Sequence, residues 1–187
     1  MAIEYGPTLD EGLALLDPFI REGATKKVFH AQWNGLPAAI KIYRERDTVF
    51  NQPILQTVDA KREFADYQSF AQSILAAYTP EPYTLVHQED NVTGLAVAWK
   101  EGGPLFDLKG RYYPARLEFE RLRALLTRWP EPPFPSSEMW DPMNLSHDQH
   151  KGFWFSECLF DADIKFRKDY TQRISETFNK LIATYGG

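Results

Sequence analysis

A two-residue turn between two alternating segments constrains the fold of this chain more than any other feature. Asn34-Gly35 separates KKVFHAQW (26–33) from LPAAIKIY (36–43), and this dipeptide in such a setting is the strongest short-range signal for a β-hairpin. YTLVHQ and VTGLAVAW, joined by a polar EDN turn, predict a second hairpin. Between the hairpins, residues 57–78 carry apolar side chains at helical spacing, which predicts an amphipathic helix. The first half is therefore expected to contain antiparallel strands and one helix.

The second half is expected to contain helices and one further hairpin. Leucines at helical spacing in residues 111–129 predict a helix whose first turn contains Pro114. Residues 144–163 predict a hairpin that turns at DQHKG (148–152). Residues 169–187 predict a closing helix that ends in glycines.

Two further segments complete the predicted organisation. Residues 101–110 are rich in glycine and proline, and this change in composition marks a boundary between two lobes. At the N-terminus, residues 8–20 predict a helix that begins at Thr8 or Asp10 and ends near Pro18.

Composition argues against several classes of protein. The net charge of −5 argues against a broad nucleic-acid-binding face, and no apolar run approaches the ~20 residues that cross a bilayer. One cysteine excludes an internal disulfide, and four scattered histidines do not make a zinc site. The first residues lack the features of a signal peptide. We therefore expect a cytoplasmic protein with no membrane or nucleic-acid partner.

Lys41 raises a question, because it interrupts the apolar run AAIKIY. In a strand its side chain points away from both neighbouring isoleucines. One interpretation is an edge strand with a solvated lysine. The other is a lysine that enters a cleft and meets a phosphate and a carboxylate.

The order of elements in the first hundred residues, with these motifs, resembles the small lobe of the protein-kinase-like fold. IREGATKKV (20–28) is similar to a degraded glycine-rich loop in which Gly23 is the middle glycine. AAIKIY is similar to the lysine strand of the family, so the resemblance implies that Lys41 binds the α- and β-phosphates of ATP. It also implies an ion-pair partner on the following helix, and Glu63 lies 22 residues after Lys41.

LAVAWKEGGPLFDL (95–108) resembles the last small-lobe strand and the hinge that follows it. The resemblance implies that Val97 guards the back of the adenine pocket. The backbone groups of Ala98, Trp99 and Lys100 would then hydrogen-bond the adenine base.

SEMWDPMN (137–144) aligns with the catalytic loop of the family, where Pro142 and Asn144 match. Asn144 would bind a magnesium ion. Met139 stands where the family has its catalytic aspartate, and a thioether cannot accept a proton from a substrate hydroxyl. Asp141, two residues further on, is a candidate for a relocated base or for a group that repels the nucleotide.

FSECLFDADIKF (155–166) resembles the strand that ends in the metal-binding motif of the family. Asp161 takes the place of the metal-binding aspartate, and Asp163 offers a second carboxylate. Together with Asn144, these oxygen ligands suit Mg²⁺.

The resemblance implies an α+β, bilobal protein-kinase-like fold. Residues 1–100 would form an antiparallel-sheet N-lobe with one helix, and residues 101–187 a truncated, mainly helical C-lobe. The C-lobe would lack an activation segment and the helices that present a peptide substrate.

We expect an atypical protein kinase that uses ATP and Mg²⁺ to phosphorylate a Ser, Thr or Tyr hydroxyl of a protein. Its catalytic residues would be Lys41, Glu63, Asp141 and Asp161. The alternative is a pseudokinase that binds nucleotide or a protein partner, and Trp99, Trp129 and Trp140 suit either an interface or a core. A third interpretation is an acidic structural protein without nucleotide. The minimal C-lobe is also similar to small bacterial kinase-like effectors, which a specialised system secretes into host cells.

Overall fold

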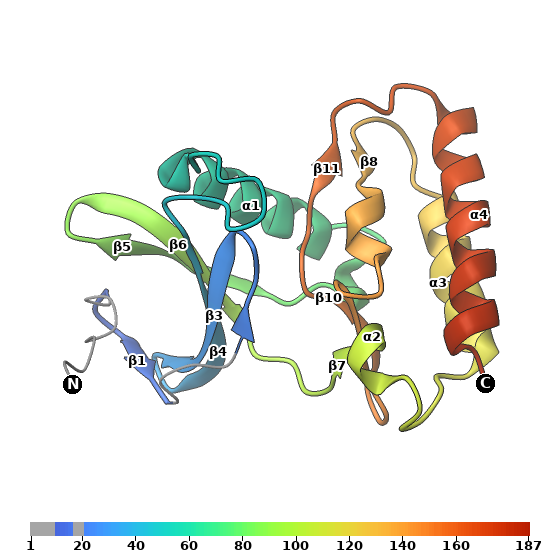
Figure 1. The fold of residues 1–187 in the computed structure, drawn as a ribbon, viewed down its shortest axis with the longest axis horizontal. Helices are drawn as coiled ribbons and strands as arrows, with labels where there is room; N and C mark the ends of the chain where they lie inside the picture. The colour runs from blue at the N-terminus through green and yellow to red at the C-terminus, as the bar shows by residue number, and fades with distance from the viewer. Residues whose placement is uncertain (1–9, 17–20) are drawn as a thin grey trace. The chain divides into compact units, whose positions relative to one another are not determined.

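The two hairpins predicted for the first half join in one antiparallel sheet. This computed structural model describes residues 10–16 and 21–187, which adopt a mixed α+β fold (Figure 1). The main sheet has the strand order β1-β3-β4-β6-β5, and β2 also pairs with β3. Its strands are β1 (Leu13–Leu15), β2 (Arg21–Glu22), β3 (Lys26–Trp33), β4 (Leu36–Tyr43), β5 (Pro82–Gln88) and β6 (Asn91–Ala98).

The described residues divide into two compact units. The first contains the main sheet and the larger part of α1, within residues 10–68 and 81–100; the second contains residues 69–80 and 101–187. One crossing between the units therefore falls at Lys100–Glu101, at the start of the Gly- and Pro-rich segment. Residues 69–80 lie before that point in the sequence and yet belong to the second unit.

The turn Asn34-Gly35 fixes the register of the first hairpin, as predicted. Both residues have positive φ angles, 48° and 81°, which is the backbone that a two-residue turn of type I′ requires. Trp33 then faces Leu36, and the pairing continues to Lys26 opposite Tyr43. The second hairpin, β5 with β6, is also confirmed.

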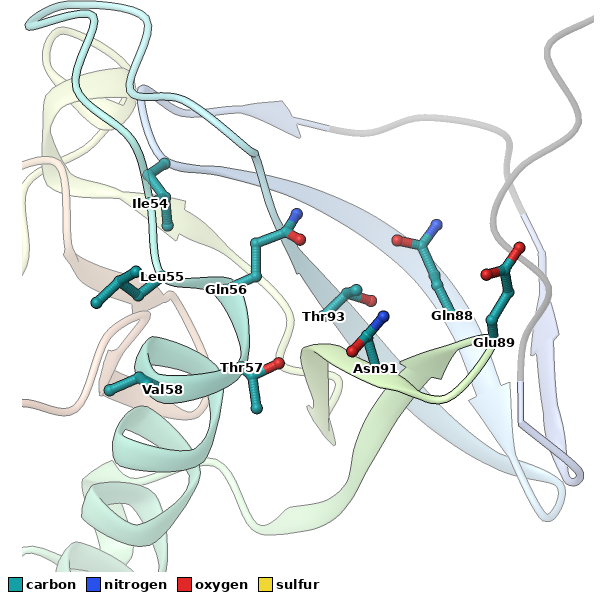
Figure 2. Close-up of a pocket in the computed structure, with 9 residues that line it drawn as sticks. All are labelled: Ile54, Leu55, Gln56, Thr57, Val58, Gln88, Glu89, Asn91 and Thr93. Atoms are coloured by element: carbon teal, nitrogen blue, oxygen red, sulfur yellow. The ribbon is translucent and has the colours of Figure 1, made fainter.

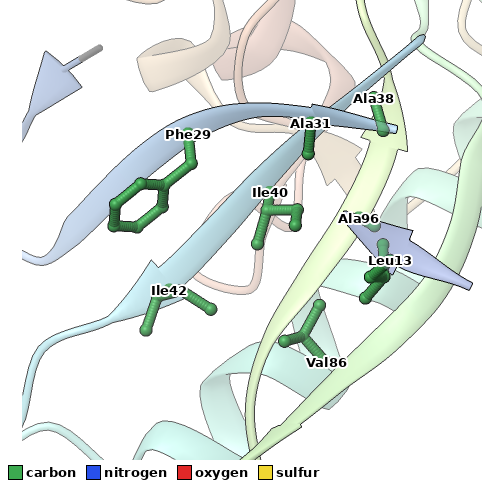
Figure 3. Packing of buried hydrophobic residues seen from close by; sticks show 8 residues of the cluster. All are labelled: Leu13, Phe29, Ala31, Ala38, Ile40, Ile42, Val86 and Ala96. Carbon is green, nitrogen blue, oxygen red and sulfur yellow. The ribbon is translucent and has the colours of Figure 1, made fainter. Parts of the chain in front are cut away.

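The main sheet curls so that its two edges contribute to one apolar cluster (Figure 3). Side chains from β1, β3, β4, β5 and β6 form it: Leu13, Phe29, Ala31, Ala38, Ile40, Ile42, Val86 and Ala96. Asp10, just before β1, accepts one hydrogen bond from the backbone N–H of His87 on β5 at 2.9 Å, and the same carboxylate oxygen lies 3.0 Å from the ring Nδ1 of His87. This contact links the two edge strands.

The prediction of a helix over residues 8–20 is wrong for residues 10–16, the part of this segment that the structure describes. Leu13–Leu15 form β1 and pair with Ala31–Trp33 of β3, while residues 8, 9 and 17–20 lie outside the described residues. Gly12 has a φ of 90° and turns the chain into the strand. Backbone pairing and burial of Leu13 against the sheet override the local helical preference of this segment.

The helix predicted over residues 57–78 is shorter than expected. α1 spans Gln56–Ala71 and is followed by a separate short 3₁₀ helix, η1 (Ala76–Tyr78). Ser73 lies between them: its hydroxyl donates to the Phe70 carbonyl at 2.8 Å and accepts the Leu75 N–H at 3.0 Å. Over the same residues the backbone changes to 3₁₀-type hydrogen bonds, from the Gln72 N–H to the Ser69 carbonyl and from the Ser73 N–H to the Phe70 carbonyl, and α1 ends here.

Two antiparallel helices, α3 (Arg116–Thr127) and α4 (Arg167–Tyr185), pack together in the second unit (Figure 1). The Tyr170 hydroxyl donates to the Leu126 carbonyl at 3.0 Å, and the Gly187 N–H donates to the Pro114 carbonyl at 2.9 Å. Pro114 was expected inside the first helical turn, but α3 begins after Ala115, so the proline precedes the helix.

The hairpin predicted at residues 144–163 is present as β9 (Leu145–Asp148) and β10 (Gly152–Phe155). The other elements of this unit are β7 (Gly103–Pro104), β8 (Phe134–Pro135), β11 (Phe160–Asp161), α2 (Leu105–Leu108) and η2 (Ser137–Trp140). β7 pairs with β9, and β8 pairs with β11. Trp129 and Trp140 are buried core residues. Among the described helices, none is long and apolar enough to cross a membrane.

Candidate functional site

Lys41 and Glu63 form the ion pair that the resemblance to the kinase small lobe implies. The Lys41 Nζ lies 3.0 Å from Glu63 Oε1. The lysine residue is 5% exposed and the glutamate 0%. The interpretation of Lys41 as a solvated lysine on an edge strand is therefore wrong: β4 is an interior strand between β3 and β6, and the ammonium group is buried against α1.

A second lysine, which the sequence analysis did not identify, binds the same carboxylate. Lys26 Nζ lies 2.9 Å from Glu63 Oε2, and Lys26 is 7% exposed. Tyr43 also donates its hydroxyl to Glu63, and Lys41 donates to the Tyr67 hydroxyl at 2.6 Å. Each carboxylate oxygen of Glu63 thus accepts from a different lysine.

The strand register and the helical period explain why these side chains meet. Lys26 lies opposite Tyr43, and Val28 lies opposite Lys41, so the two lysines share one face of the sheet. Glu63 and Tyr67 are four residues apart on α1 and share one face of the helix. The Asn34-Gly35 turn fixes the pairing of β3 with β4 and therefore determines which β3 side chains share a face with Lys41. The placement of Lys26 beside Lys41 could thus have been predicted from the register of this hairpin.

The two lysines control the ionisation of Glu63. Burial raises the pKa of this carboxyl, but the charges of Lys26 and Lys41, with the hydrogen bond from Tyr43, outweigh burial and lower the pKa from 4.5 to about 2. Glu63 is therefore an anion at neutral pH.

Gly23 lies in the tight turn between β2 and β3. Its N–H donates to the Lys26 carbonyl at 2.8 Å, and its own carbonyl accepts from Arg44 Nε at 3.1 Å. A Cβ at this position would meet only the Lys26 carbonyl oxygen at 3.5 Å, an ordinary contact. The fold itself does not require glycine at position 23.

The hinge residues predicted to contact adenine lie at the end of β6. Val97 is buried, and its partner in the ladder is Ala39, so its side chain is on the same sheet face as Lys41. The Ala98 N–H donates to the Glu81 carbonyl and the Trp99 N–H to the Pro37 carbonyl. Of the three N–H groups in this segment, only that of Lys100 makes no backbone hydrogen bond within the described part of the chain.

The catalytic-loop candidates lie on and after η2 in the second unit. Met139 is fully buried, so its side chain belongs to the core. Asp141 is exposed, and its Oδ1 accepts the Met143 N–H at 2.9 Å. Asn144 donates its amide N–H to the Glu138 carbonyl at 3.0 Å, which leaves the amide oxygen as the atom suited to a cation.

Asp161 and Asp163 are joined by a local turn at the end of β11. Asp161 Oδ1 accepts the N–H groups of Asp163 at 2.8 Å and Ile164 at 3.3 Å, and Arg173 lies 3.7 Å from its other oxygen. In the described ranges no group of three or more His, Cys, Asp or Glu side chains is placed to hold a metal ion by itself.

A separate hollow of about 590 Å³ lies at the start of α1 and contains none of the predicted site residues (Figure 2). Its lining is largely polar and uncharged, with Glu89 as the one acidic member: Ile54, Leu55, Gln56, Thr57, Val58, Gln88, Glu89, Asn91 and Thr93.

Among the predicted site residues, the structure brings Lys41 and Glu63 together in the first unit, and Asp161 with Asp163 in the second. No protein-family model and no curated protein sequence matches this chain.

Proposed function

We propose that this protein binds MgATP and transfers its γ-phosphoryl group to a Ser, Thr or Tyr hydroxyl of a protein substrate. The observation that carries the proposal is the buried ion pair between Lys41 on β4 and Glu63 on α1. A lysine held in this way by a carboxylate has fixed donors, so binding a phosphate costs less ordering. The antiparallel order β1-β3-β4-β6-β5, with α1 inserted between β4 and β5 in the chain, also supports a kinase-like N-lobe.

Within this proposal, the first unit binds the nucleotide. Lys41 would contact the α- and β-phosphates, and Gly23 would allow the turn after β2 to approach them closely. Val97 would face the adenine, and the backbone N–H of Lys100 would be the donor that the hinge offers to it.

The second unit would supply the metal ligands and the acid–base group. Asn144, Asp161 and Asp163 present the amide and carboxylate oxygens that Mg²⁺ prefers, and Mg²⁺ in such sites takes only one or two carboxylates and completes its shell with phosphates and water. When bound, the ion neutralises charge on the phosphate oxygens. Because Mg²⁺ needs so few protein ligands, the absence of a three-residue acidic cluster among the described residues is compatible with this role.

The transfer itself would be a direct displacement. The acceptor hydroxyl oxygen bonds to the γ-phosphorus, the bond from that phosphorus to the β,γ-bridging oxygen breaks, and ADP leaves. The hydroxyl proton would pass to Asp141, which is exposed. A general base contributes typically ~10²–10⁴-fold, so the loss of the usual aspartate at Met139 would slow transfer without abolishing it.

Incubation of the protein with Mg²⁺ and γ-labelled ATP, alone and with cell lysates, tests this function. We expect label on protein, and we expect the variants Lys41→Met and Asp161→Asn to lose it. Lys27→Met, which changes a partly exposed lysine on the same strand as Lys26, is the matched control and should transfer normally. Nucleotide binding without any transfer would reject the kinase activity.

That outcome would favour the second candidate function, a pseudokinase that acts through nucleotide or partner binding. The buried Met139 favours this alternative, because no ionisable group stands at the position of the family's catalytic base. Direct binding of MgATP, with no phosphoryl transfer to any protein, would distinguish it from the kinase.

A further inference from the structure

The hollow of about 590 Å³ at the start of α1 lies within the first unit and contains none of the residues assigned to the nucleotide (Figure 2). The first turn of α1 and the residues just before it form one side, and the β5–β6 hairpin forms the other. Its volume is in the range of pockets that bind small molecules. The chemistry of its lining indicates which ligand it suits.

Thr93 on β6 gives the hollow a buried polar group without a partner. The residue is 4% exposed, and its hydroxyl makes no hydrogen bond to any described residue. Leu95 lies opposite Lys41 in the ladder, so Thr93, two residues before Leu95, is on the sheet face that α1 covers. Figure 2 shows the Thr93 side chain among the lining residues, between Gln56 and Asn91. A buried hydroxyl that no protein group satisfies costs free energy, which is evidence for a ligand that supplies the missing partner.

The first turn of α1 adds backbone donors to this side of the hollow. The N–H groups of Gln56, Thr57 and Val58 make no hydrogen bond within the described part of the chain, as is usual for the first N–H groups of a helix. α1 has 16 residues, so the positive end of its dipole lies here. The Gln56 amide donates to the Tyr43 carbonyl at 2.7 Å and the Thr57 hydroxyl to the Val92 carbonyl at 2.8 Å, which holds both side chains in place. This end suits a negatively charged oxygen of a ligand.

Glu89, in the β5–β6 turn, determines what the rest of the ligand carries. It is exposed and is the one ionisable side chain among the described residues that line the hollow. Figure 2 shows it on the side away from Leu55 and Val58. This lining has no Lys, Arg or His to neutralise a phosphate, and Glu89 repels a ligand with negative charge alone. A ligand with a carboxylate at one end and an ammonium at the other satisfies both sides.

Three aliphatic side chains complete the lining. Leu55 is 66% exposed and Val58 is 57% exposed, and Ile54 lines the hollow beside them. Aliphatic side chains next to polar groups pack against the apolar part of a ligand and remove both surfaces from water. The hollow thus offers the positive end of a helix, one carboxylate and an apolar surface.

We propose that this hollow binds a free amino acid with an apolar side chain. The carboxylate of the ligand accepts hydrogen bonds from the first N–H groups of α1 and from the Thr93 hydroxyl. Its ammonium group donates to Glu89, and its side chain packs against Leu55 and Val58. This site goes beyond the proposed nucleotide function and does not rest on it.

Titration of the wild-type chain with L-leucine, followed by nuclear magnetic resonance of the backbone amides, locates the site directly. We expect the amide signals of Gln56, Thr57, Val58 and Thr93 to shift with one common Kd, and those of α4 in the second unit to stay unchanged. A ligand of this size is expected to bind with a Kd of ~1 mM. No shift at about 10 mM leucine, ten times that Kd, or shifts that avoid these four residues, would overturn the proposal.

Two analogues of leucine test the two charges separately. Leucinamide keeps the ammonium group and the side chain and lacks the carboxylate, so it should bind at least about tenfold more weakly. 4-Methylpentanoate lacks only the ammonium group and should bind about twofold to fivefold more weakly, because its partner Glu89 is exposed. Binding of leucinamide as tight as that of leucine, or tighter binding of 4-methylpentanoate, contradicts a site for the zwitterion.

Thr93→Val removes the hydroxyl and keeps the shape of the side chain. It should raise the Kd for leucine by about tenfold, while urea unfolding of the free protein shows no loss of stability, because the hydroxyl has no partner to lose. A purely structural role for Thr93 predicts the reverse, lower stability with unchanged binding, and that result would overturn its role as a ligand contact.

Glu89→Gln and Asp90→Asn form a matched pair in the β5–β6 turn. Asp90 is also exposed but does not line the hollow. Glu89→Gln should raise the Kd for leucine by about twofold to fivefold, and Asp90→Asn should leave it unchanged. Equal effects of the two variants would show that Glu89 makes no specific contact with the ammonium group.

Discussion

Gly94 on β6 packs directly against the backbone carbonyl of Lys41 on β4. A Cβ at position 94 would overlap the Lys41 carbonyl oxygen and lie 3.0 Å from the Lys41 carbonyl carbon. The two strands are hydrogen-bonded neighbours at this point, with Gly94 opposite Ile42. Glycine at position 94 thus lets β6 come close to the strand that carries Lys41.

Gly94→Ala should therefore destabilise the protein by about 3 kcal/mol, the upper end of the cost of overpacking, because the obstacle is backbone and cannot rotate away. Urea unfolding measures this change in free energy. Gly103→Ala is the matched control, since it also lies in a strand and a Cβ there meets nothing within 4 Å. Equal stability of the two variants would contradict the close approach of β4 and β6.

Removal of the Glu63 carboxylate should be strongly destabilising. Glu63→Ala takes away the anion that two buried lysines share, and breaking a buried ion pair in this way typically costs about 3–5 kcal/mol. Lys61→Ala, on the exposed face of the same helix, should cost less than about 0.5 kcal/mol. A loss below 1 kcal/mol for Glu63→Ala, measured by urea unfolding, would show that the cluster contributes little to stability.

The pKa of Glu63 predicts how stability depends on pH. The folded pKa of about 2 is below the ordinary 4.5, so the contribution of Glu63 is fully present above pH 4.5 and is lost as the pH falls toward 2. The difference in unfolding free energy between wild type and Glu63→Gln should shrink by about 2 kcal/mol between pH 6 and pH 3. A difference that stays constant across this range would rule out a lowered pKa.

Two glycines in turns should respond differently to alanine. Gly35 has a φ of 81° and open space around its Cβ position, so Gly35→Ala should cost about 1–2 kcal/mol from backbone strain alone. Gly23 has no positive φ and only an ordinary contact at 3.5 Å, so Gly23→Ala should change stability by less than about 0.5 kcal/mol. Thermal unfolding compares the stabilities of the two variants. A larger loss for Gly23→Ala than for Gly35→Ala would contradict the positive φ of Gly35 and the ordinary backbone of Gly23.

Local signals predicted most of the first unit. The Asn34-Gly35 turn fixed one hairpin, and the resemblance to the kinase small lobe implied the ion pair of Lys41 and Glu63. The segment around Leu13 was wrongly predicted to be helical, because its strand exists only through pairing with β3. Lys26 was missed because a single lysine on a strand is informative only once the register is known.

The second unit was less predictable because long-range packing decides the surroundings of its candidate residues. The sequence aligned Met139 with a catalytic position but could not reveal that its side chain is buried in the core. The division of the chain likewise depends on contacts distant in sequence, which assign residues 69–80 to the second unit.

Binding of ATP with and without Mg²⁺ tests the central claim most directly. Calorimetry should show that wild type binds both forms, that Lys41→Met weakens both, and that Asp161→Asn weakens MgATP while leaving metal-free ATP unchanged. The asparagine keeps an oxygen that can accept the Asp163 N–H, so the local turn is retained. Failure of wild type to bind either form, or equal affinities in all three proteins, would contradict a nucleotide site that uses Lys41 for phosphate and Asp161 for the metal.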